Sequence, residues 1–239
     1  MTSRRNPNVI DRSTNVHHRH RAAPLLGVSL TATQDHKAAP RDSWQRVNDV
    51  FAALELTTGS SVADLGAGGG WFTTRLARAV GESGRVYAVD VNPVSLRELR
   101  SALPEELTNV ETVRAEEDDP RLPAGRLDAV LVVNAYHEFA EYASVLARVK
   151  EALKPGGRLV LIEPTPAAAN VTRPDQTRRH TIAIEFAEAD LAAAGFEIVR
   201  RDTAFITRPQ HTGPDGKPIR HQDWLLVARR PADSRPFER

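Results

Sequence analysis

Short apolar runs alternate along this chain with segments in which apolar residues recur every three or four positions. Several of the runs are rich in Val, Leu and Ala and lack the apolar–polar alternation of a strand with one solvent-exposed face. Continuous runs of this kind are typical of strands that are buried on both faces of a parallel sheet. We expect five such strands, at Ser61–Leu65, Arg85–Asp90, Val110–Arg114, Leu127–Asn134 and Arg158–Glu163.

Helical periodicity fills the intervals between these runs. Apolar stripes predict helices over Trp71–Val80 and Tyr142–Leu153, and Pro93 marks the first turn of another. A further helical pattern begins at Trp44 and ends before Gly59, a residue type that favours helix ends. Strands that alternate with helices predict an α/β fold in which helices cover both faces of the sheet.

The pattern changes after Glu163. A helix is expected over Thr181–Ala194, followed by a strand near Phe196–Ala204. The turn-rich stretch Gly213–Pro218 then precedes a last apolar run at Trp224–Val227. Two strands joined by such a turn most simply form an antiparallel hairpin at the edge of the sheet.

The length of 239 residues and the hydrophobic share of 41% suit one domain of medium size. Residues 1–40 show no sustained periodicity, so we predict a flexible basic N-terminal extension there, a domain over 41–230 and a C-terminal tail over 231–239. The extension contains His17, His18 and His20 without a fixed scaffold around them. We therefore expect a solvated tail and no metal site.

Charge is distributed unevenly, although the formal net charge is only +1. Residues 1–40 contain six basic and two acidic residues, which leaves 26 basic and 29 acidic residues for the rest of the chain. A domain that binds nucleic acid usually has a basic excess, because it displaces counterions from phosphates. Nucleic acid is therefore not expected as a partner of the main domain.

The chain has no cysteine, which excludes disulfides, thiolate metal ligands and thiol nucleophiles. No apolar run approaches the roughly 20 residues that span a bilayer, so we expect no membrane span and a cytoplasmic location. The alternative is export, because the segment Ala22–Ala32 follows an Arg-rich stretch as the apolar core of a signal peptide does.

The strongest functional signal is the segment VADLGAGGGW, residues Val62–Trp71, between a predicted buried strand and a predicted helix. Its glycines let a ligand approach the backbone, and the helix that follows presents unpaired N–H groups to the same space. The spacing G-x-G-x-G lacks the third glycine of a dinucleotide fingerprint, because Trp71 occupies that position. Asp90, 24 positions after Gly66, ends the next strand and suits the hydroxyls of a ribose. Asp90 alone leaves NAD and an adenosine-type ligand open.

Five motifs in order now carry a resemblance: DLGAGGG, VYAVDVNP, EDDPRLP, LDAVLVVNAYHEF and LKPGGRLVLIE. The set resembles class I S-adenosylmethionine-dependent methyltransferases, and most of all their small-molecule branch with the ubiquinone/menaquinone-type enzymes. It spans roughly Trp44–Arg229. The resemblance implies a doubly wound, Rossmann-like, mostly parallel seven-stranded sheet with the C-terminal antiparallel hairpin. It also implies S-adenosyl-L-methionine as the cofactor.

The resemblance assigns cofactor-binding roles to the glycine segment. Gly66, Ala67, Gly68 and Gly70 would cradle the methionine part of the cofactor. Asp64 would support this loop or the ammonium group of the cofactor, directly or through water.

The later strands supply the residues expected around the adenosine part. Asp90 resembles the acid that binds the ribose, with Val91 and Asn92 beside the adenine. Asp118 matches the acid that meets the adenine amino group, and the neighbouring Glu117 and Asp119 are the alternatives for this role.

Beyond the fourth strand the resemblance points to the reacting groups. Asn134 lies where the backbone of family members contacts the cofactor near its sulfonium. His137 is expected either as a general base, since an imidazole titrates near neutrality, or as a residue that only shapes the pocket. Tyr136 would orient the acceptor. Together with Trp44 and Arg178, Tyr136 and His137 are the expected substrate-binding residues.

The implied reaction is in-line transfer of a methyl group to a small-molecule acceptor, which relies mainly on positioning and desolvation. Two alternatives stay open. One is an NAD(P)-dependent oxidoreductase, and the other is a non-catalytic regulatory protein that binds S-adenosylmethionine. A homodimer is also left open.

Overall fold

The computed structural model describes residues 39–167, 172–208, 211–212, 218–219 and 221–232. The predicted extension over 1–40 lies outside these residues except for its last two positions. The same holds for Gly213–Pro218 apart from Pro218, and for the tail over 231–239 apart from its first two residues. Within the described part of the chain, no helix combines the length and apolar character needed to cross a membrane.

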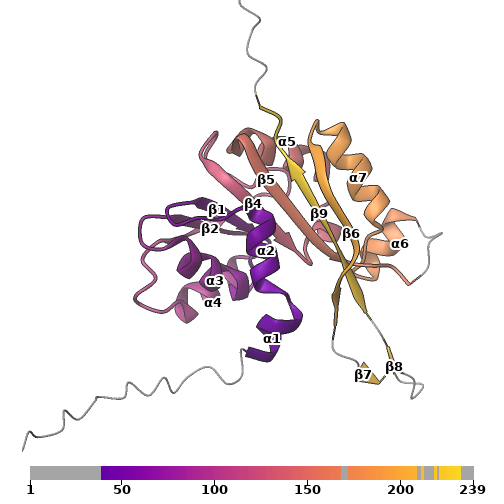
Figure 1. The fold of residues 1–239 in the computed structure, drawn as a ribbon, viewed down its shortest axis with the longest axis horizontal. Coiled ribbons are helices and arrows are strands. Elements are labelled where there is room, and N and C mark those ends of the chain that lie inside the picture. Colours follow the sequence, from indigo (N-terminus) through magenta and orange to yellow (C-terminus); the bar gives the residue numbers. More distant parts are fainter. Residues whose placement is uncertain (1–38, 168–171, 209–210, 213–217, 220, 233–239) are drawn as a thin grey trace, which may run out of the picture. The chain divides into compact units, whose positions relative to one another are not determined.

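Seven strands form one mixed sheet, and the predicted fold class is confirmed. The first five strands along the chain pair in parallel, whereas β9 pairs antiparallel with both β5 and β6 and lies between them (Figure 1). In spatial order the strands are β3 (Val110–Arg114), β2 (Arg85–Asp90), β1 (Ser61–Leu65), β4 (Leu127–Val133), β5 (Leu153–Pro164), β9 (Gln222–Arg229) and β6 (Glu197–Thr207).

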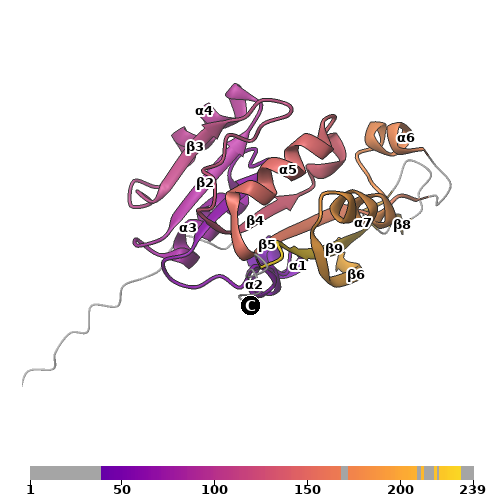
Figure 2. The same cartoon turned by 90° about the horizontal axis from the view of Figure 1, so that it is seen from above.

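Helices cover the sheet on both faces, and Figure 2 shows α2 on the opposite side of it from α5 and α7. Alternate residues of β4 explain why the strand is continuously apolar over residues 129–133: Ala129 and Leu131 belong to one buried cluster, and Val130 and Val132 belong to the other. The first cluster includes side chains of α2 (Val47–Leu54) and α3 (Trp71–Val80), and the second includes side chains of α5 (Tyr142–Ala152) and α7 (Ile184–Ala193).

The order of the strands reverses between β1 and β4, since β2 follows β1 on one side and β4 lies on the other. In open α/β sheets, ligands bind at the carboxyl ends of the strands beside such a reversal. The helix α4 (Pro93–Ala102), which joins β2 to β3, begins at this edge. The fold therefore predicts a ligand site at the loops after β1, β2 and β4.

The predicted helix from Trp44 onward is broken in the structure. The helix α1 (Ala39–Trp44) ends two residues before α2 begins. The break lies at Arg46, which adopts a left-handed conformation with φ 52°. The Arg46 guanidinium donates a hydrogen bond of 2.8 Å to the carbonyl of Phe205 and lies 4.4 Å from the centre of the Phe205 ring. These tertiary contacts explain a turn that the apolar pattern does not reveal.

The predictions also missed several short elements. The 3-10 helix η1 (Tyr136–Glu138) follows β4, and α6 (Arg173–Arg178) precedes α7 in a stretch without apolar periodicity. The strands β7 (His211–Thr212) and β8 (Pro218–Ile219) form a separate antiparallel pair. The predicted edge pair is confirmed as β6 and β9, with the correction that β9 lies inside the sheet.

Candidate functional site

The glycine loop joins β1 to α3 at the edge where the strand order reverses. Gly66 has φ 82°, and a Cβ atom at this position would lie 2.4 Å from the Cβ of Ala135 in the loop after β4. Gly68 has φ 51°, and a Cβ there would meet nothing within 4 Å. Gly66 therefore allows two loops to pack closely, whereas Gly68 leaves room for a ligand beside the backbone.

Asp90, the last residue of β2, organises this loop. One carboxylate oxygen accepts the N–H of Gly68 and the other accepts the N–H of Asn92, both at 2.8 Å. The side chain of Asn92 in turn caps α4 by accepting the N–H of Val94 at 2.8 Å. A carboxylate has about four positions for accepting hydrogen bonds, so Asp90 retains acceptor capacity for ligand hydroxyls.

A cavity of about 360 Å³ opens on the Asp90 side of the loop. Its walls come from the loops after β1, β2, β3 and β4, and include Gly68, Asp90, Val91, Glu117 and Asn134. Of the acids considered for the adenine, Glu117 lines this cavity, and Asp118 and Asp119 are not among its lining residues.

A second cavity, of about 800 Å³, lies beside the same loop and shares Gly66 and Asn134 with the first. Asp64, Ala67, Gly70, Trp44, Trp71, Arg41 and Arg208 are among its lining residues. The two cavities thus meet at the glycine loop and Asn134, where the resemblance placed the sulfonium of the cofactor.

Asn134 is held at this junction from two directions. Its backbone N–H donates to the carbonyl of Ile162 at 2.8 Å, and its own backbone is left-handed with φ 55°. The Asn134 side-chain oxygen accepts a hydrogen bond of 3.3 Å from Arg208, whose Nε lies 2.9 and 3.0 Å from the two carboxylate oxygens of Asp223. No local sequence pattern points to Arg208 or Asp223, because the first follows β6 and the second lies in β9, far along the chain from the glycine loop.

Asp64 lies in the wall of the second cavity and is only 3% exposed. Its carboxylate accepts a hydrogen bond of 2.6 Å from the hydroxyl of Thr73 in α3. Burial raises the pKa of Asp64 to about 6, and the hydrogen bonds from Thr73 only partly oppose this shift. A cationic ligand group would stabilise the ionised form.

The pair predicted to contact the acceptor is enclosed by protein. Tyr136 has no exposed surface, and its hydroxyl donates to Asp190 at 2.8 Å; burial and the charge of Asp190 raise the Tyr136 pKa far above its usual value. His137 is 2% exposed, and its Nδ1 lies 2.6 Å from Oε2 of Glu163. Among the described residues around the two cavities, neither Tyr136 nor His137 is a lining residue.

Glu163, near the end of β5, is fully buried and was missed by the sequence predictions. Its Oε1 accepts the N–H groups of Ala135 and Tyr136 at 2.7 and 2.6 Å, so the carboxylate fixes the start of η1. Burial lowers the pKa of His137, but the hydrogen bond and charge of Glu163 outweigh this effect and raise it. An acid at the end of an apolar strand is the signal for such a group, since a buried charge needs partners.

The other two predicted acceptor residues lie apart. Trp44, at the end of α1, lines the second cavity. Arg178 forms an ion pair with Asp175 within α6 and lines a shallow pocket with Glu138 and Tyr142. The structure therefore brings Trp44 to the glycine loop and leaves Arg178 outside both cavities.

Comparison with known proteins agrees with this geometry. Residues 62–157 match the family model described as a methyltransferase domain. A ubiquinone/menaquinone biosynthesis C-methyltransferase of Psychromonas ingrahamii is 32% identical over 110 residues, which are 45% of this chain and 44% of that protein. The chain thus spans less than half the length of the curated relatives it matches.

Solved structures share the fold. A SAM-dependent methyltransferase from Aquifex aeolicus superposes with a TM-score of 0.62 at 24% identity, over 77% of this chain and 88% of that one. The [4+2]-cyclase SpnF superposes with a TM-score of 0.67 at 20% identity, over 80% of this chain and 83% of that one.

The resemblance seen in the five sequence motifs is thereby confirmed. The matched segment contains the glycine loop, Asp90, Glu117 and Asn134, and it covers most of the parallel strands from β1 to the start of β5. Residues 62–157 match a methyltransferase domain, and the relatives and solved structures that share it include S-adenosylmethionine-dependent methyltransferases of class I, whose cofactor is S-adenosyl-L-methionine.

Proposed function

We propose that this protein transfers a methyl group from S-adenosylmethionine to a small anionic acceptor. The observation that carries the proposal is the junction of two cavities at the glycine loop and Asn134. One cavity offers acceptors for a ribose and an adenine, and the other offers aromatic faces and guanidinium groups. Such a pair of sites suits two small molecules that react with each other.

The first cavity would hold the adenosine part of the cofactor. Asp90 would accept hydrogen bonds from the ribose hydroxyls, with Val91 at the adenine and Glu117 at its amino group. We assign this last role to Glu117 rather than to Asp118, because Glu117 lines the cavity. The methionine part would cross the glycine loop, with its ammonium group toward the carboxylate of Asp64.

The second cavity would hold the acceptor. Arg75 lies 3.8 Å and Arg41 lies 4.2 Å from the centre of the Trp71 ring. Burial and then the charges of Arg75 and Arg208 lower the pKa of Arg41, so positive groups crowd this cavity. An anion beside them would relieve this repulsion, and the ring of Trp44 in the same wall suits a planar acceptor.

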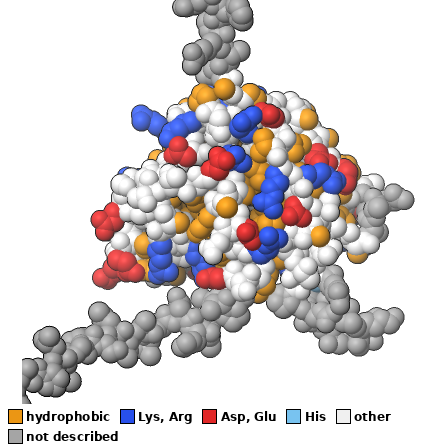
Figure 3. All heavy atoms as spheres, viewed as in Figure 1, with side chains coloured by type: hydrophobic (Ala, Val, Ile, Leu, Met, Phe, Trp, Pro, Cys, Tyr) orange, Lys and Arg blue, Asp and Glu red, His pale blue; other side chains and the backbone are white. Residues whose placement is uncertain are grey.

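An anionic acceptor would need no general base, since its attacking atom already carries a lone pair free of a proton. Methyl transfer would then depend on in-line positioning and on the exclusion of water. General-base catalysis by His137 stays a prediction from the sequence. On the face seen in Figure 3, basic and acidic side chains are interspersed, which favours a small acceptor over nucleic acid.

Calorimetric titration with S-adenosylmethionine, its demethylated product and NADH tests the cofactor. We expect both sulfur compounds to bind and NADH to give no heat. Binding of NADH alone would instead support the oxidoreductase alternative and overturn the proposal.

A second experiment tests the reaction. Transfer of a labelled methyl group is measured with a panel of phenols, carboxylates and amines, and we expect methylation within the anionic classes. The fold also occurs in a [4+2]-cyclase, so the fold alone does not define the reaction. Binding of the cofactor without methylation of any compound would favour the non-catalytic alternative.

A further inference from the structure

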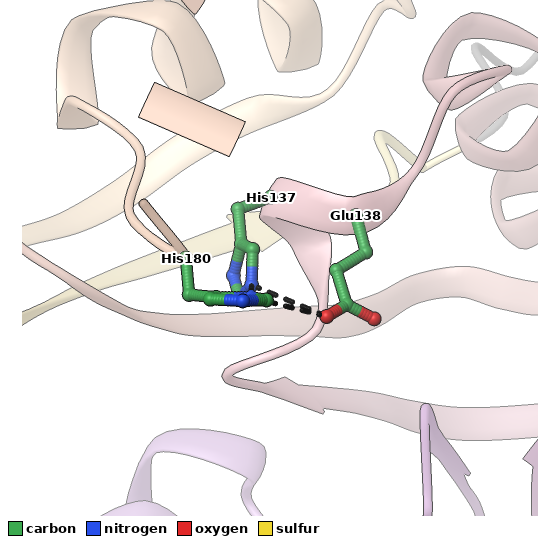
Figure 4. A group of neighbouring side chains, drawn as sticks. All are labelled: His137, Glu138 and His180. Atoms are coloured by element: carbon green, nitrogen blue, oxygen red, sulfur yellow. Dashed lines mark hydrogen bonds and ion pairs between the residues drawn. The ribbon is translucent and has the colours of Figure 1, made fainter. Parts of the chain in front are cut away.

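Three side chains that could hold a metal ion meet where η1 and the segment after α6 come together. His137 and Glu138 belong to η1, and His180 follows α6 (Figure 4). The Nε2 of His137 lies 3.4 Å from Nδ1 of His180 and 3.6 Å from Oε1 of Glu138. The third separation, between Nδ1 of His180 and Oε1 of Glu138, is 3.4 Å. Two imidazole nitrogens and one carboxylate oxygen thus form a nearly equilateral triangle.

The distances between the three ligand atoms indicate which coordination geometry the cluster suits. Zinc bonds of about 2.0–2.1 Å to nitrogen and oxygen, arranged tetrahedrally, separate the ligand atoms by about 3.3–3.4 Å. Octahedral bonds of about 2.1 Å, as Mg²⁺ requires, would separate adjacent ligands by only about 3.0 Å. The observed 3.4, 3.4 and 3.6 Å agree with the tetrahedral arrangement. Two imidazoles and one carboxylate are also a ligand set found in zinc enzymes.

Glu163 orients His137, one of the three candidate ligands. Its Oε2 lies 2.6 Å from Nδ1 of His137, and its Oε1 is occupied by two backbone N–H groups. When Nδ1 carries the proton that Glu163 accepts, Nε2 presents its lone pair to the centre of the triangle. A carboxylate behind a metal-binding histidine fixes the ring and strengthens it as a ligand.

The other two ligands are open to solvent. The side chains of His180 and Glu138 are 73% and 62% exposed, whereas that of His137 is 1% exposed. An ion therefore has an entry path, and a fourth position would remain for water or another oxygen ligand. His180 adopts a left-handed conformation, with φ 53°, at the position where its ring reaches η1.

We propose that His137, Glu138 and His180 form a binding site for a zinc-class divalent cation, with three protein ligands and one open position. The site differs from the expectation of no metal, and it stands independently of methyl transfer. Glu138 also lines the first cavity, which we propose holds the adenosine part of the cofactor, so the ion would lie beside that site.

The test is titration of the full chain with Zn²⁺, followed by calorimetry, and with Co²⁺, followed by visible absorption. Because His17, His18 and His20 also offer imidazoles, the parent protein carries the substitutions His17→Asn, His18→Asn and His20→Asn. We expect saturable binding of one ion per chain and a Co²⁺ spectrum of tetrahedral type. Separate Glu138→Gln and His180→Ala substitutions in this parent should weaken Zn²⁺ binding at least about tenfold. Loss of a group that only hydrogen-bonds to a metal ligand already lowers metal affinity about 10–100-fold, and these two residues would be ligands themselves.

Matched controls are Glu141→Gln and Arg179→Gln, which change exposed residues next to the cluster. Both controls should bind Zn²⁺ as the parent does. Circular dichroism verifies that each variant is folded, and buried His137 is left unchanged for this reason. Absence of one-site binding in the parent, or equal affinity in the ligand and control variants, would overturn the proposal.

Discussion

Acidic side chains near the carboxyl ends of neighbouring strands differ in what surrounds them, and these surroundings decide their roles. Asp90 uses both carboxylate oxygens to hold backbone N–H groups of two loops. Asp64 is buried against Thr73 and has a raised pKa. Glu117 lies at the wall of a cavity without belonging to a strand. Residue type alone does not distinguish these environments.

Replacing Asp90 should weaken cofactor binding. We expect Asp90→Ala to cost at least ~1.5 kcal/mol of binding free energy for S-adenosylmethionine, because charged hydrogen bonds are lost and the loop at Gly68 loses its partner. Calorimetry measures the change. Unaltered affinity in the folded variant would show that the ribose is bound elsewhere.

Glu117 and Asp118 form a matched pair of exposed neighbouring acids. Glu117→Gln should weaken S-adenosylmethionine binding by about 1 kcal/mol or more, since a charged acceptor for the adenine amino group becomes neutral. Asp118→Asn should leave the affinity unchanged. A reversal of the two results would return the adenine contact to Asp118.

Asp64 gives cofactor binding a pH dependence. Its pKa of about 6 in the free protein lies above the ordinary 3.8, because burial disfavours the charge and Asp90 adds repulsion. The raised pKa stabilises the folded protein at low pH, and this contribution is lost as the pH rises through about 6. The ionised form is the one that attracts an ammonium group. Affinity for S-adenosylmethionine should therefore increase from pH 5 to pH 7.

The Asp64→Asn variant is the control for this titration. Its amide oxygen still accepts from Thr73, but the side chain carries no charge. The variant should bind more weakly at pH 7 and should lose most of the pH dependence between pH 5 and 7. An equally steep dependence in the variant would assign the titration to another group.

At the scale of elements, β5 positions η1 through one buried side chain. Glu163 lies 26–28 residues from its three hydrogen-bond partners along the chain. The loop after β4 therefore depends on the neighbouring strand for its conformation. Arg46 acts similarly, since its contact with Phe205 accompanies the break between α1 and α2.

Removal of the Glu163 carboxylate should destabilise the fold. Glu163→Ala leaves two backbone N–H groups and the Nδ1–H of His137 without their acceptor, so we expect the free energy of unfolding to fall by about 3 kcal/mol or more at pH 7. Denaturant titration in the presence of a chelator measures it. Glu163→Gln retains an acceptor oxygen and should lose less. Equal losses in the two variants would contradict the proposed role of the hydrogen bonds.

At the scale of the whole molecule, the parallel and the antiparallel parts of the main sheet both contribute residues to one site. The parallel strands contribute the glycine loop, Asp90 and Asn134, and the end of antiparallel β6 leads to Arg208. Cofactor binding at this junction should therefore stabilise the entire domain.

The demethylated product of the cofactor, at about 100 times its dissociation constant, should stabilise the fold by about 2.7 kcal/mol. For a chain of this size that corresponds to a rise in Tm of roughly 5–10 °C. Thermal denaturation followed by circular dichroism tests the expectation, with NADH at the same concentration as control. A rise with NADH and none with the product would contradict the cofactor assignment.

Much of the fold was predictable from sequence because its signals are local. The runs at β1, β2 and β3 and the helix α3 have the predicted bounds, since each is defined by its own periodicity and by glycine or charged residues at its ends. The short elements η1 and α6 were missed, because neither contains enough apolar residues to show a period.

The sequence by itself determined the α/β class, the glycine loop and the acid that ends β2, because each is encoded within one contiguous segment. Only the tertiary structure decided that Glu163 supports His137, that His180 meets Glu138, and that Arg208 reaches Asn134. The last pair is separated by 74 residues and comes together through the order of strands in the sheet. Periodicity records which face of an element is buried, but it does not record which elements become neighbours.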